Sequence, residues 1–352
     1  MMYSFIDDLE KIKELDKSGM LKTLRGFPED CRRAIGMAEV IPLGDLSDVA
    51  FKAIVFVGMG GSAIAGKLIC DWLLEESHIP MVVSKGYHVP HFVDEETLVF
   101  AVSYSGNTEE TLSALRKAMD RGSAVVSLTS GGSMERLSRD KGLVLLRVPG
   151  GLRPRASLPY QFFMIATVLN RLGLIPSSWE EVDEAIKVLG ELRNEMVPEV
   201  PADSNPSKKL ALSLINKVPF VYGPRLFEGV AYRFGTQLNE NGKVPATSGV
   251  FPEVFHNAVL GCEGPDEALK PLCVLIIRDP EEPDEITGKV DRFKALMEPV
   301  VGGVIEERAR GRGKLARMLS VLYLGDYTST YLGLHYGKDP SSMDAIEELK
   351  RV

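Results

Sequence analysis

The chain has 352 residues, of which 45% are hydrophobic and 26% are charged, as in an ordinary globular protein. Its length suits two domains of about 150 residues each. The net charge of −8 argues against binding to nucleic acid or to a membrane surface, since either partner requires a basic face. The charged first residues do not suit a signal peptide, and no apolar stretch reaches membrane-spanning length. The cysteines form no CxxC pair, so we expect reduced thiols and a cytoplasmic protein.

The first half of the chain has the pattern of a parallel sheet flanked by helices. Residues 1–40 predict an N-terminal helical segment, and a first domain is expected over residues 41–195. Buried parallel strands are predicted at residues 51–57, 81–84, 97–103, 124–129 and 143–148. Residues 106–122, between two of these strands, have helical spacing and end in glycine. Alternation of this kind is typical of an α/β domain.

The second half repeats the pattern after a proline-rich stretch. Three prolines within residues 196–210 predict a linker, which is followed by a second domain over residues 211–352. Strands are predicted at residues 218–223, 272–279 and 301–307, with a helix through EGVAYRFGTQLNENG and two further helices at the end of the chain. We therefore expect an α/β protein with two doubly wound parallel sheets of the flavodoxin type.

The stretch GMGGSAIAGKL, residues 58–68, follows the first strand and is typical of a phosphate-binding loop. Its GxxxxGK spacing suits a nucleotide P-loop, but Leu68 stands where that motif needs a hydroxyl for Mg²⁺. GMGGSA also fits a dinucleotide motif, but Ser84 and Lys85 stand where an acidic residue should hold the ribose. Both nucleotide motifs fail on their second requirement, so we expect no cofactor.

A second stretch, SYSGNTEET at residues 103–111, also follows a strand and opens a helix. Ser103, Ser105 and Thr108 provide hydroxyls, and Gly106 lets the backbone come close. Backbone N–H groups and the positive end of a helix dipole attract an anion, although Thr108 could instead only cap the helix. These loops and the turn LTSGG at residues 128–132 follow strands of one sheet, at the edge where ligands bind. We therefore expect a phosphate monoester as the ligand.

These motifs resemble a known family. GMGGS, SYSGNTEET and LTSGG resemble the sugar isomerase (SIS) domain, which binds phosphosugars. PRASLPY, LNENGKVP, PEVFHNAV and IEELKRV resemble the bifunctional phosphoglucose/phosphomannose isomerases, which have two SIS domains in tandem. The resemblance covers most of the chain. It implies an isomerase that interconverts glucose 6-phosphate and mannose 6-phosphate with fructose 6-phosphate.

The resemblance also implies the site residues. It places the substrate phosphate on Gly61, Ser62, Ser103, Ser105 and Thr108. It places a catalytic arginine, which also contacts substrate, on Arg155, the catalytic glutamate on Glu240, the histidine on His256 and a lysine of the C-terminal helix on Lys350. No metal is expected, because Pro90 separates His88 from His91 and keeps them off a shared helical face.

The reaction suits these residue types. It opens the sugar ring and moves a proton between carbons 1 and 2 through an enediol, which needs a carboxylate base. Glu240 precedes Asn241-Gly242, a helix-stop signal, and the negative end of a helix dipole makes a carboxylate a better base. His256 can exchange a proton with the ring oxygen near neutral pH. Arg155 can stabilise the enediolate oxygen.

Alternatives stay open at several positions. Arg153 is the rival of Arg155, and Lys338 is the alternative to Lys350 for assisting ring opening. In relatives the histidine reaches the active site of the neighbouring subunit, so the resemblance implies a homodimer. Met343 stands where relatives often have small or polar residues, so the motifs predict the isomerase class but do not settle the use of mannose phosphate.

Other functions of the same fold are a non-catalytic phosphosugar sensor and an isomerase for another phosphosugar. A sensor would usually have a helix-turn-helix domain and would not need Glu240, His256 and Arg155 together. Isomerases of arabinose or heptose phosphates usually have one SIS domain, and a glucosamine-phosphate enzyme is expected with an amidotransferase module. A cupin-type, metal-dependent mannose-phosphate isomerase is a barrel of antiparallel strands, which the βα alternation does not suit.

Overall fold

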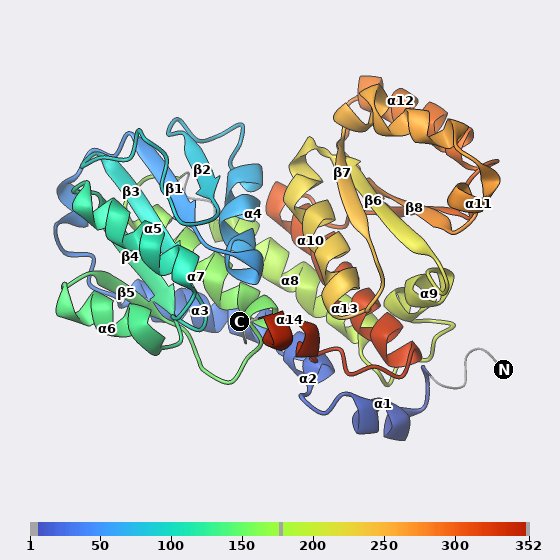
Figure 1. The fold of residues 1–352 in the computed structure, drawn as a ribbon, viewed down its shortest axis with the longest axis horizontal. Coiled ribbons are helices and arrows are strands. Elements are labelled where there is room, and N and C mark those ends of the chain that lie inside the picture. Colours follow the sequence, from blue (N-terminus) through green and yellow to red (C-terminus); the bar gives the residue numbers. More distant parts are fainter. Residues whose placement is uncertain (1–5, 176–178, 350–352) are drawn as a thin grey trace. The chain divides into compact units, whose positions relative to one another are not determined.

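The computed structural model describes residues 6–175 and 179–349, and the chain divides into two compact units (Figure 1). Unit 1 combines residues 1–26 with residues 180–352, and unit 2 consists of residues 27–179. Each unit contains a parallel sheet flanked by helices, so the expected α/β fold class is confirmed. Residues 196–210, expected as a linker, lie inside unit 1 and include the start of helix α9 (Pro206–Ser213).

Unit 2 is built on a sheet whose described strands run in the order β2-β1-β3-β4-β5, the flavodoxin-type order. The strands are β1 (Ala53–Val57), β2 (Met81–Ser84), β3 (Thr97–Val102), β4 (Ala124–Thr129) and β5 (Val144–Arg147). All were expected from their apolar runs. Every residue of β1 and β3 is buried, because helices cover these central strands on both faces.

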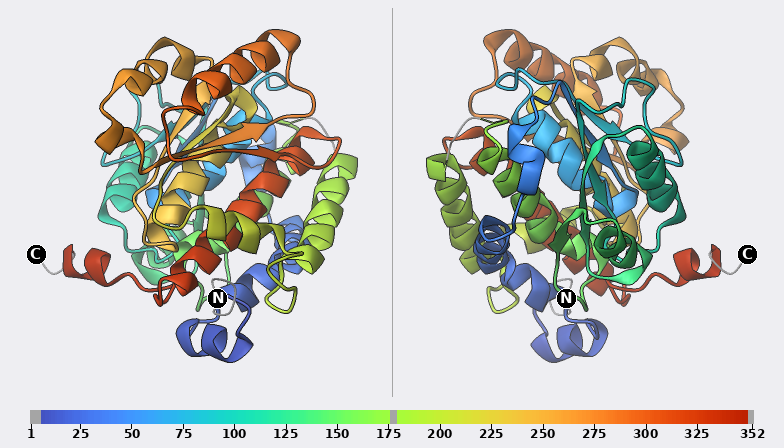
Figure 2. Two further views of the ribbon diagram at one scale, coloured as in Figure 1. Left: turned by 90° about the vertical axis from the view of Figure 1, so that its right-hand side faces the viewer. Right: turned by 90° about the vertical axis from the view of Figure 1, so that its left-hand side faces the viewer.

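The helices of unit 2 form a layer on each face of this sheet (Figures 1 and 2). They are α3 (Phe27–Glu39), η1 (Gly44–Asp48), η2 (Gly60–Ser62), α4 (Ile64–Trp72), α5 (Glu109–Asp120), α6 (Gly132–Asp140), η3 (Pro154–Ser157) and α7 (Leu158–Arg171). Val55 and Val57 of β1 pack in one core with Leu115 of α5. Phe56 meets α4 instead, so closely that a Cβ at Gly66 would lie 2.4 Å from the Cβ of Phe56.

Unit 1 has a second parallel sheet, whose described strands run in the order β7-β6-β8-β9. They are β6 (Val218–Pro224), β7 (Thr247–Phe251), β8 (Leu272–Arg278) and β9 (Val304–Arg308). The sequence predicted β6, β8 and β9 but not β7. Strand β7 lies at the sheet edge and buries only Phe251, so it has no continuous apolar run.

The helices of unit 1 pack on this sheet and on one another. They are α1 (Leu9–Leu15), α2 (Met20–Arg25), α8 (Trp179–Met196), η4 (Arg225–Phe227), α10 (Glu228–Glu240), η5 (Glu253–His256), η6 (Ala258–Glu263), α11 (Asp266–Leu269), α12 (Asp284–Met297), α13 (Lys314–His335) and α14 (Asp344–Leu349), together with α9. Helix α12 contributes Phe293 to a core with Tyr222 and Ile276 of the sheet. Helix α10 lies against β6 and β7 and packs on the long buried helix α13.

A buried lysine fixes the start of the chain to unit 1. Lys208 is fully buried, and its Nζ donates a hydrogen bond to Oδ1 of Asp7 at 2.8 Å. The same Nζ donates to the backbone carbonyls of Pro198 at 2.8 Å and Val200 at 2.9 Å. The carboxylate of Asp7 also accepts the N–H of Ala202 at 3.0 Å. One ammonium group thus joins segments about 200 residues apart in sequence.

Removal of this lysine should destabilise unit 1. We expect Lys208→Ala to lower the free energy of unfolding by about 1–3 kcal/mol, because the part-buried carbonyls of Pro198 and Val200 lose their donor. Lys209→Ala, at the next residue with an exposed side chain, should change it by less than about 0.5 kcal/mol. Urea unfolding followed by circular dichroism measures both variants. Equal midpoints for the two would contradict the assigned role of Lys208.

Candidate active site

The loops that follow β1, β3 and β4 meet at the carboxyl edge of the sheet in unit 2. The Oγ of Ser62, after β1, accepts a hydrogen bond from the N–H of Tyr104, after β3, at 3.3 Å. The hydroxyls of Thr129 and Ser130 donate to the carbonyl of Tyr104 at 3.3 and 2.7 Å. The loops in which the sequence predicted a phosphate site therefore lie together.

Two glycines allow the loops after β3 and β4 to come this close. A Cβ at Gly106 would lie 1.8 Å from the carbonyl oxygen of Gly131, and one at Gly132 would lie 2.4 Å from that of Ser105. Gly106 and Gly132 also have left-handed φ angles of 68° and 73°. Glycine alone satisfies both the space and the backbone conformation here.

The hydroxyl groups of the loop after β3 differ in what they can offer a ligand. Ser103 is fully buried, and its Oγ donates to Oγ1 of Thr108 at 2.9 Å and accepts the N–H of Gly106 at 3.1 Å. Its proton is used inside the loop, so Ser103 shapes the loop. Thr108 accepts that hydrogen bond and keeps its own proton to donate. Ser105 is exposed and accepts the N–H of Asn107 at 3.3 Å.

The start of helix α5 faces this loop. Thr108 is its N-cap residue, and the side chain makes no capping hydrogen bond. The alternative in which Thr108 only caps the helix therefore does not describe this geometry. The positive end of the helix dipole remains at the loop, which is a favourable place for an anion.

Arg155 lies next to the loop after β1. It belongs to η3, and a Cβ at Gly61 would lie 3.0 Å from the backbone nitrogen of Arg155 and 3.1 Å from its Cα. Arg155 is 2% exposed, whereas its rival Arg153 is half-buried. The structure therefore brings Gly61 and Arg155 together within one unit.

Tyr104 organises this edge of the sheet, and the sequence analysis missed it. Its hydroxyl donates to the carbonyl of Pro149 at 3.0 Å and accepts the N–H of Leu152 at 2.7 Å. It thereby joins the loop after β3 to the segment that leads to η3 and Arg155. The signal in the sequence was its position between Ser103 and Ser105, but a single buried tyrosine is more often part of a core.

Glu240 is the last residue of α10, as the following Asn241-Gly242 predicted. Asn241 is buried, and its Nδ2 donates to the Oγ of Ser329 in α13 at 3.2 Å. A Cβ at Gly333 of α13 would lie 2.1 Å from the carbonyl oxygen of Asn241. The end of α10 is thus fixed on α13, and this fixes the position of Glu240 within unit 1.

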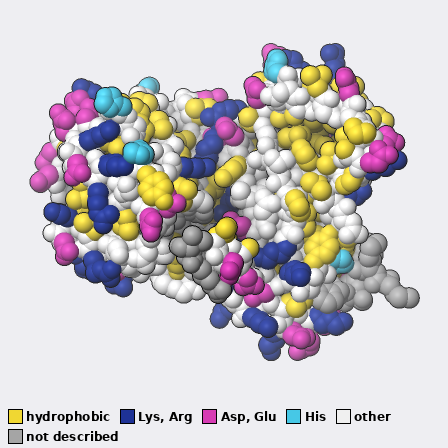
Figure 3. Space-filling model, in the orientation of Figure 1, with side chains coloured by type: hydrophobic (Ala, Val, Ile, Leu, Met, Phe, Trp, Pro, Cys, Tyr) yellow, Lys and Arg dark blue, Asp and Glu magenta, His cyan; other side chains and the backbone are white. Residues whose placement is uncertain are grey.

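His256 is exposed at the end of the 3-10 helix η5, whereas FPEVFHN predicted an extended stretch before it. Leu260, in the next 3-10 helix, is 63% exposed. Figure 3 shows hydrophobic side chains gathered on unit 1 below α12. Phe255 and Val259 pack against the core to which α12 contributes. His256 and Leu260 are therefore both exposed in the segment formed by η5 and η6, whose Phe255 and Val259 pack on the core.

The lysine positions have different outcomes. Lys350 lies outside the described residues, directly after helix α14. Helix α14 has no buried residue. Lys338, the alternative, is exposed in the segment that joins α13 to α14.

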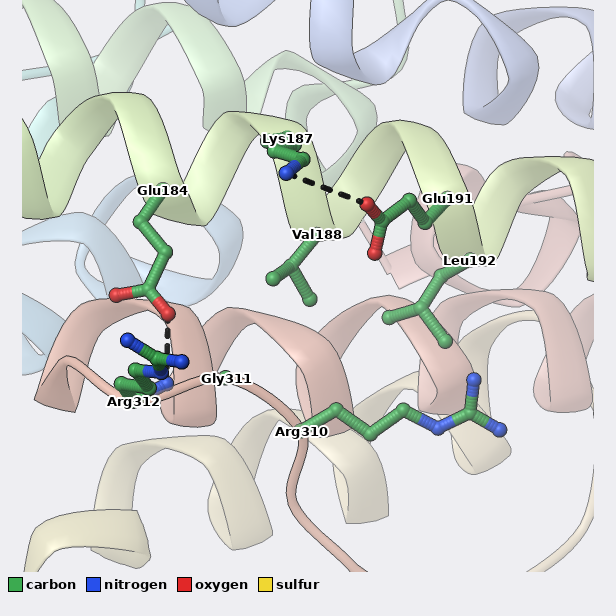
Figure 4. Close-up of a pocket in the computed structure, with 8 residues that line it drawn as sticks. All are labelled: Glu184, Lys187, Val188, Glu191, Leu192, Arg310, Gly311 and Arg312. Carbon is green, nitrogen blue, oxygen red and sulfur yellow. Dashed lines mark hydrogen bonds and ion pairs between the residues drawn. The ribbon is translucent and has the colours of Figure 1, made fainter.

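Unit 1 has a cavity of about 700 Å³ between α8 and the basic loop RARGRGK at residues 308–314 (Figure 4). Glu184 of α8 accepts the N–H groups of Arg312 at 2.7 Å and Gly313 at 2.9 Å, and these hydrogen bonds hold the pKa of Glu184 below its usual value. Glu181 accepts the N–H of Leu315 at 2.7 Å. Carboxylates of the chain itself occupy the start of α13, so we do not assign the phosphate to this loop.

No group of three or more His, Cys, Asp or Glu side chains within residues 6–175 and 179–349 could hold a metal ion. None of the helices in that same part of the chain combines the length and the apolar character that a membrane crossing requires.

Comparison with known proteins identifies the family. The SIS domain matches residues 50–168, and the bacterial phospho-glucose isomerase C-terminal SIS domain matches residues 203–352. The chain is 38% identical over 332 residues to the bifunctional phosphoglucose/phosphomannose isomerase of Caldicellulosiruptor bescii, covering 94% of this chain and 98% of that protein. The chain belongs to the bifunctional phosphoglucose/phosphomannose isomerase family.

A further member agrees with this family, and a solved structure shares the fold. The protein of the same name from Aquifex aeolicus is 36% identical over 304 residues, covering 85% of this chain and 90% of that protein. A glucose-6-phosphate isomerase like protein from Thermus thermophilus shares the fold with a TM-score of 0.66 and 21% identity, covering 97% of this chain and 99% of that chain. The tandem SIS architecture expected for this family is thus shown.

The close approach of Gly61 to Arg155 gives a test of the loop geometry. We expect Gly61→Ala to weaken the binding of fructose 6-phosphate by about tenfold or more, because the added Cβ displaces the loop from the backbone of Arg155. Isothermal titration calorimetry measures the affinity.

Gly150→Ala is the matched control in the same unit. A Cβ at Gly150 has no atom within 4 Å, and its φ is not left-handed, so this variant should bind as the wild type does. Unchanged affinity in a folded Gly61→Ala variant would contradict a phosphate site at this loop.

Proposed function

We propose that the chain interconverts glucose 6-phosphate and mannose 6-phosphate with fructose 6-phosphate by ring opening and proton transfer through an enediol. The observation that carries the proposal is the carboxyl edge of unit 2, where hydroxyl-bearing loops, the start of α5 and Arg155 lie together. The relatives of this chain are named for both activities.

The phosphate of the substrate binds at the loops of unit 2. Ser105 and Thr108 have hydroxyl protons to donate, Ser62 joins the two loops, and Ser103 holds the loop in shape. Gly61 lets the backbone come close to the phosphate oxygens. The positive end of α5 contributes to binding a dianion without a lysine clamp.

The reaction uses four titratable or charged side chains. Arg155 stabilises the enediolate oxygen, and its burial strengthens that interaction because water is excluded around it. Glu240, at the end of α10, moves the proton between carbons 1 and 2. His256 exchanges the proton of the ring oxygen during ring opening. Lys350, with Lys338 as the alternative, assists that step.

The active form is a homodimer, in which His256 acts on substrate bound by the neighbouring subunit. Two observations support this assembly: His256 is exposed on the single chain, and Leu260 of the same segment is 63% exposed. An exposed histidine and an exposed leucine in one segment suit a subunit interface, where apolar side chains are removed from water.

A cytoplasmic location fits the free thiols of the chain. Cys31, Cys70, Cys262 and Cys273 are all free, and thiols persist in a reducing compartment.

A coupled assay that starts from fructose 6-phosphate in EDTA tests the proposed reaction. It scores glucose 6-phosphate and mannose 6-phosphate separately, and we expect both products without added metal. Glu240→Gln should lower kcat by about 10²–10⁴-fold, because it removes the base. Glucose 6-phosphate alone would contradict the dual specificity. Neither product, with fructose 6-phosphate still bound, would favour the phosphosugar sensor.

Mixing two inactive variants tests the shared site. In a dimer of Glu240→Gln with His256→Ala, one site combines Glu240 of one chain with His256 of the other. An equal mixture that is unfolded and refolded together should regain about a quarter of wild-type activity, since half of the dimers are hybrids with one intact site. Activity no higher than that of the separate variants would contradict exchange of His256 between subunits.

A further inference from the structure

Lys243, three residues after Glu240, has an unusual backbone conformation. Its φ is 57°, in the left-handed region that residues other than glycine rarely adopt. The glycine of this turn is one residue earlier, and a Cβ at Gly242 would lie 2.7 Å from the carbonyl oxygen of Leu238. Glycine at position 242 thus allows the backbone to pack closely against Leu238, while Lys243 takes the left-handed position. A strained residue of this kind suggests that its side chain has a task.

The ammonium group of Lys243 joins two separate segments of unit 1. Its Nζ donates a hydrogen bond to the carbonyl oxygen of Glu240 at 2.6 Å and to that of Ser342 at 2.7 Å. The first carbonyl ends α10, where a cation is favourable at the negative end of the helix dipole. The second lies in the segment between α13 and α14. One side chain therefore connects the proposed base to the C-terminal segment.

The C-terminal segment has few other anchors to unit 1 in the described part of the chain. Helix α14 has no buried residue, and Leu349 at its end is 76% exposed. Pro340 and Ser341, which precede α14, are both buried and are therefore anchors. The position of α14 depends on the short stretch around Ser341 and Ser342, and the hydrogen bond from Lys243 lies within it.

We propose that Lys243 is a positioning residue, which ties residues 339–349 to the end of α10 and thereby fixes the helix end that carries Glu240. The inference rests on the proposed isomerase function. It assigns no contact between Lys243 and the substrate. Its effect is expected on turnover, through the placement of other groups, rather than on substrate binding.

Lys243→Gly is the decisive variant, because glycine accepts the left-handed backbone and only the side chain is lost. We expect the backbone amides of residues 339–349 to exchange with deuterium about tenfold faster or more, as followed by mass spectrometry. We also expect kcat with fructose 6-phosphate to fall by about tenfold or more, with KM changed by less than about threefold. Lys243→Arg keeps a cationic donor and should restore most of both properties.

Asn216→Gly is the matched control. Asn216 also has a left-handed φ, of 58°, and lies in unit 1. Its backbone N–H donates to the hydroxyl of Tyr336 at 2.7 Å, and glycine keeps that hydrogen bond, so this variant repeats the backbone change without removing a side-chain tether. It should leave both the exchange of residues 339–349 and kcat unchanged.

Deuterium exchange tests the tether, and kcat tests the positioning role, so the two measurements can fail separately. Unchanged exchange in Lys243→Gly would overturn the tether, and faster exchange with unchanged kcat would overturn the positioning role. A wild-type chain without isomerase activity would overturn the proposed function and the catalytic part of this inference, while the exchange measurement would still test the tether.

Discussion

Both parts of the proposed site depend on backbone segments that approach one another so closely that a side chain would crowd or block them. In unit 2, Gly61 lies against the backbone of Arg155, and Gly106 lies against that of Gly131. In unit 1, Gly333 of α13 lies against the carbonyl of Asn241, directly after Glu240. Glycine at these positions removes the Cβ that would separate the segments. The backbone that carries the functional side chains is thereby held in place by packing.

The two units share a parallel α/β architecture but differ at the carboxyl edges of their sheets. The edge of unit 2 presents hydroxyls and the start of α5. In unit 1 the corresponding groups are already neutralised within the chain. Arg278, at the end of β8, is buried in ion pairs with Glu282 and Glu306, and Glu184 takes the N–H groups before α13. The edge of unit 2 therefore offers hydrogen-bond donors to an anion, whereas carboxylates of the chain already take the donors in unit 1.

Local sequence patterns predicted those parts of the fold that local interactions determine. The buried strands of unit 2 follow from apolar runs such as AIVFV, and the end of α10 at Glu240 follows from Asn241-Gly242. Strand β7 was missed because an edge strand with one buried residue lacks such a run. The placement of the first residues in unit 1 depends on the hydrogen bonds of Lys208 to Asp7 and to distant carbonyls, which no local pattern contains.

The sequence predicted which loops of the candidate site lie together better than it predicted what each residue does there. The glycine- and hydroxyl-bearing loops that the sequence singled out do meet at one edge of the sheet, and Gly61 and Arg155 do lie together. The sequence could not show that the Ser103 hydroxyl donates its hydrogen bond within the loop, because that depends on the folded position of Thr108. Nor could it show that Tyr104 links the loops or that Lys243 bridges Glu240 and Ser342. Such roles arise from three-dimensional neighbours.

The central claim is that the carboxyl edge of unit 2 recognises the phosphate of the substrate. Calorimetric titration of the wild-type chain with fructose 6-phosphate, in the presence and absence of inorganic phosphate, tests it most directly. The account predicts that inorganic phosphate competes with fructose 6-phosphate and that unphosphorylated fructose binds at least about a hundredfold more weakly, since the anion contacts supply several kcal/mol of binding. Equal binding of fructose, or no competition from inorganic phosphate, would contradict it.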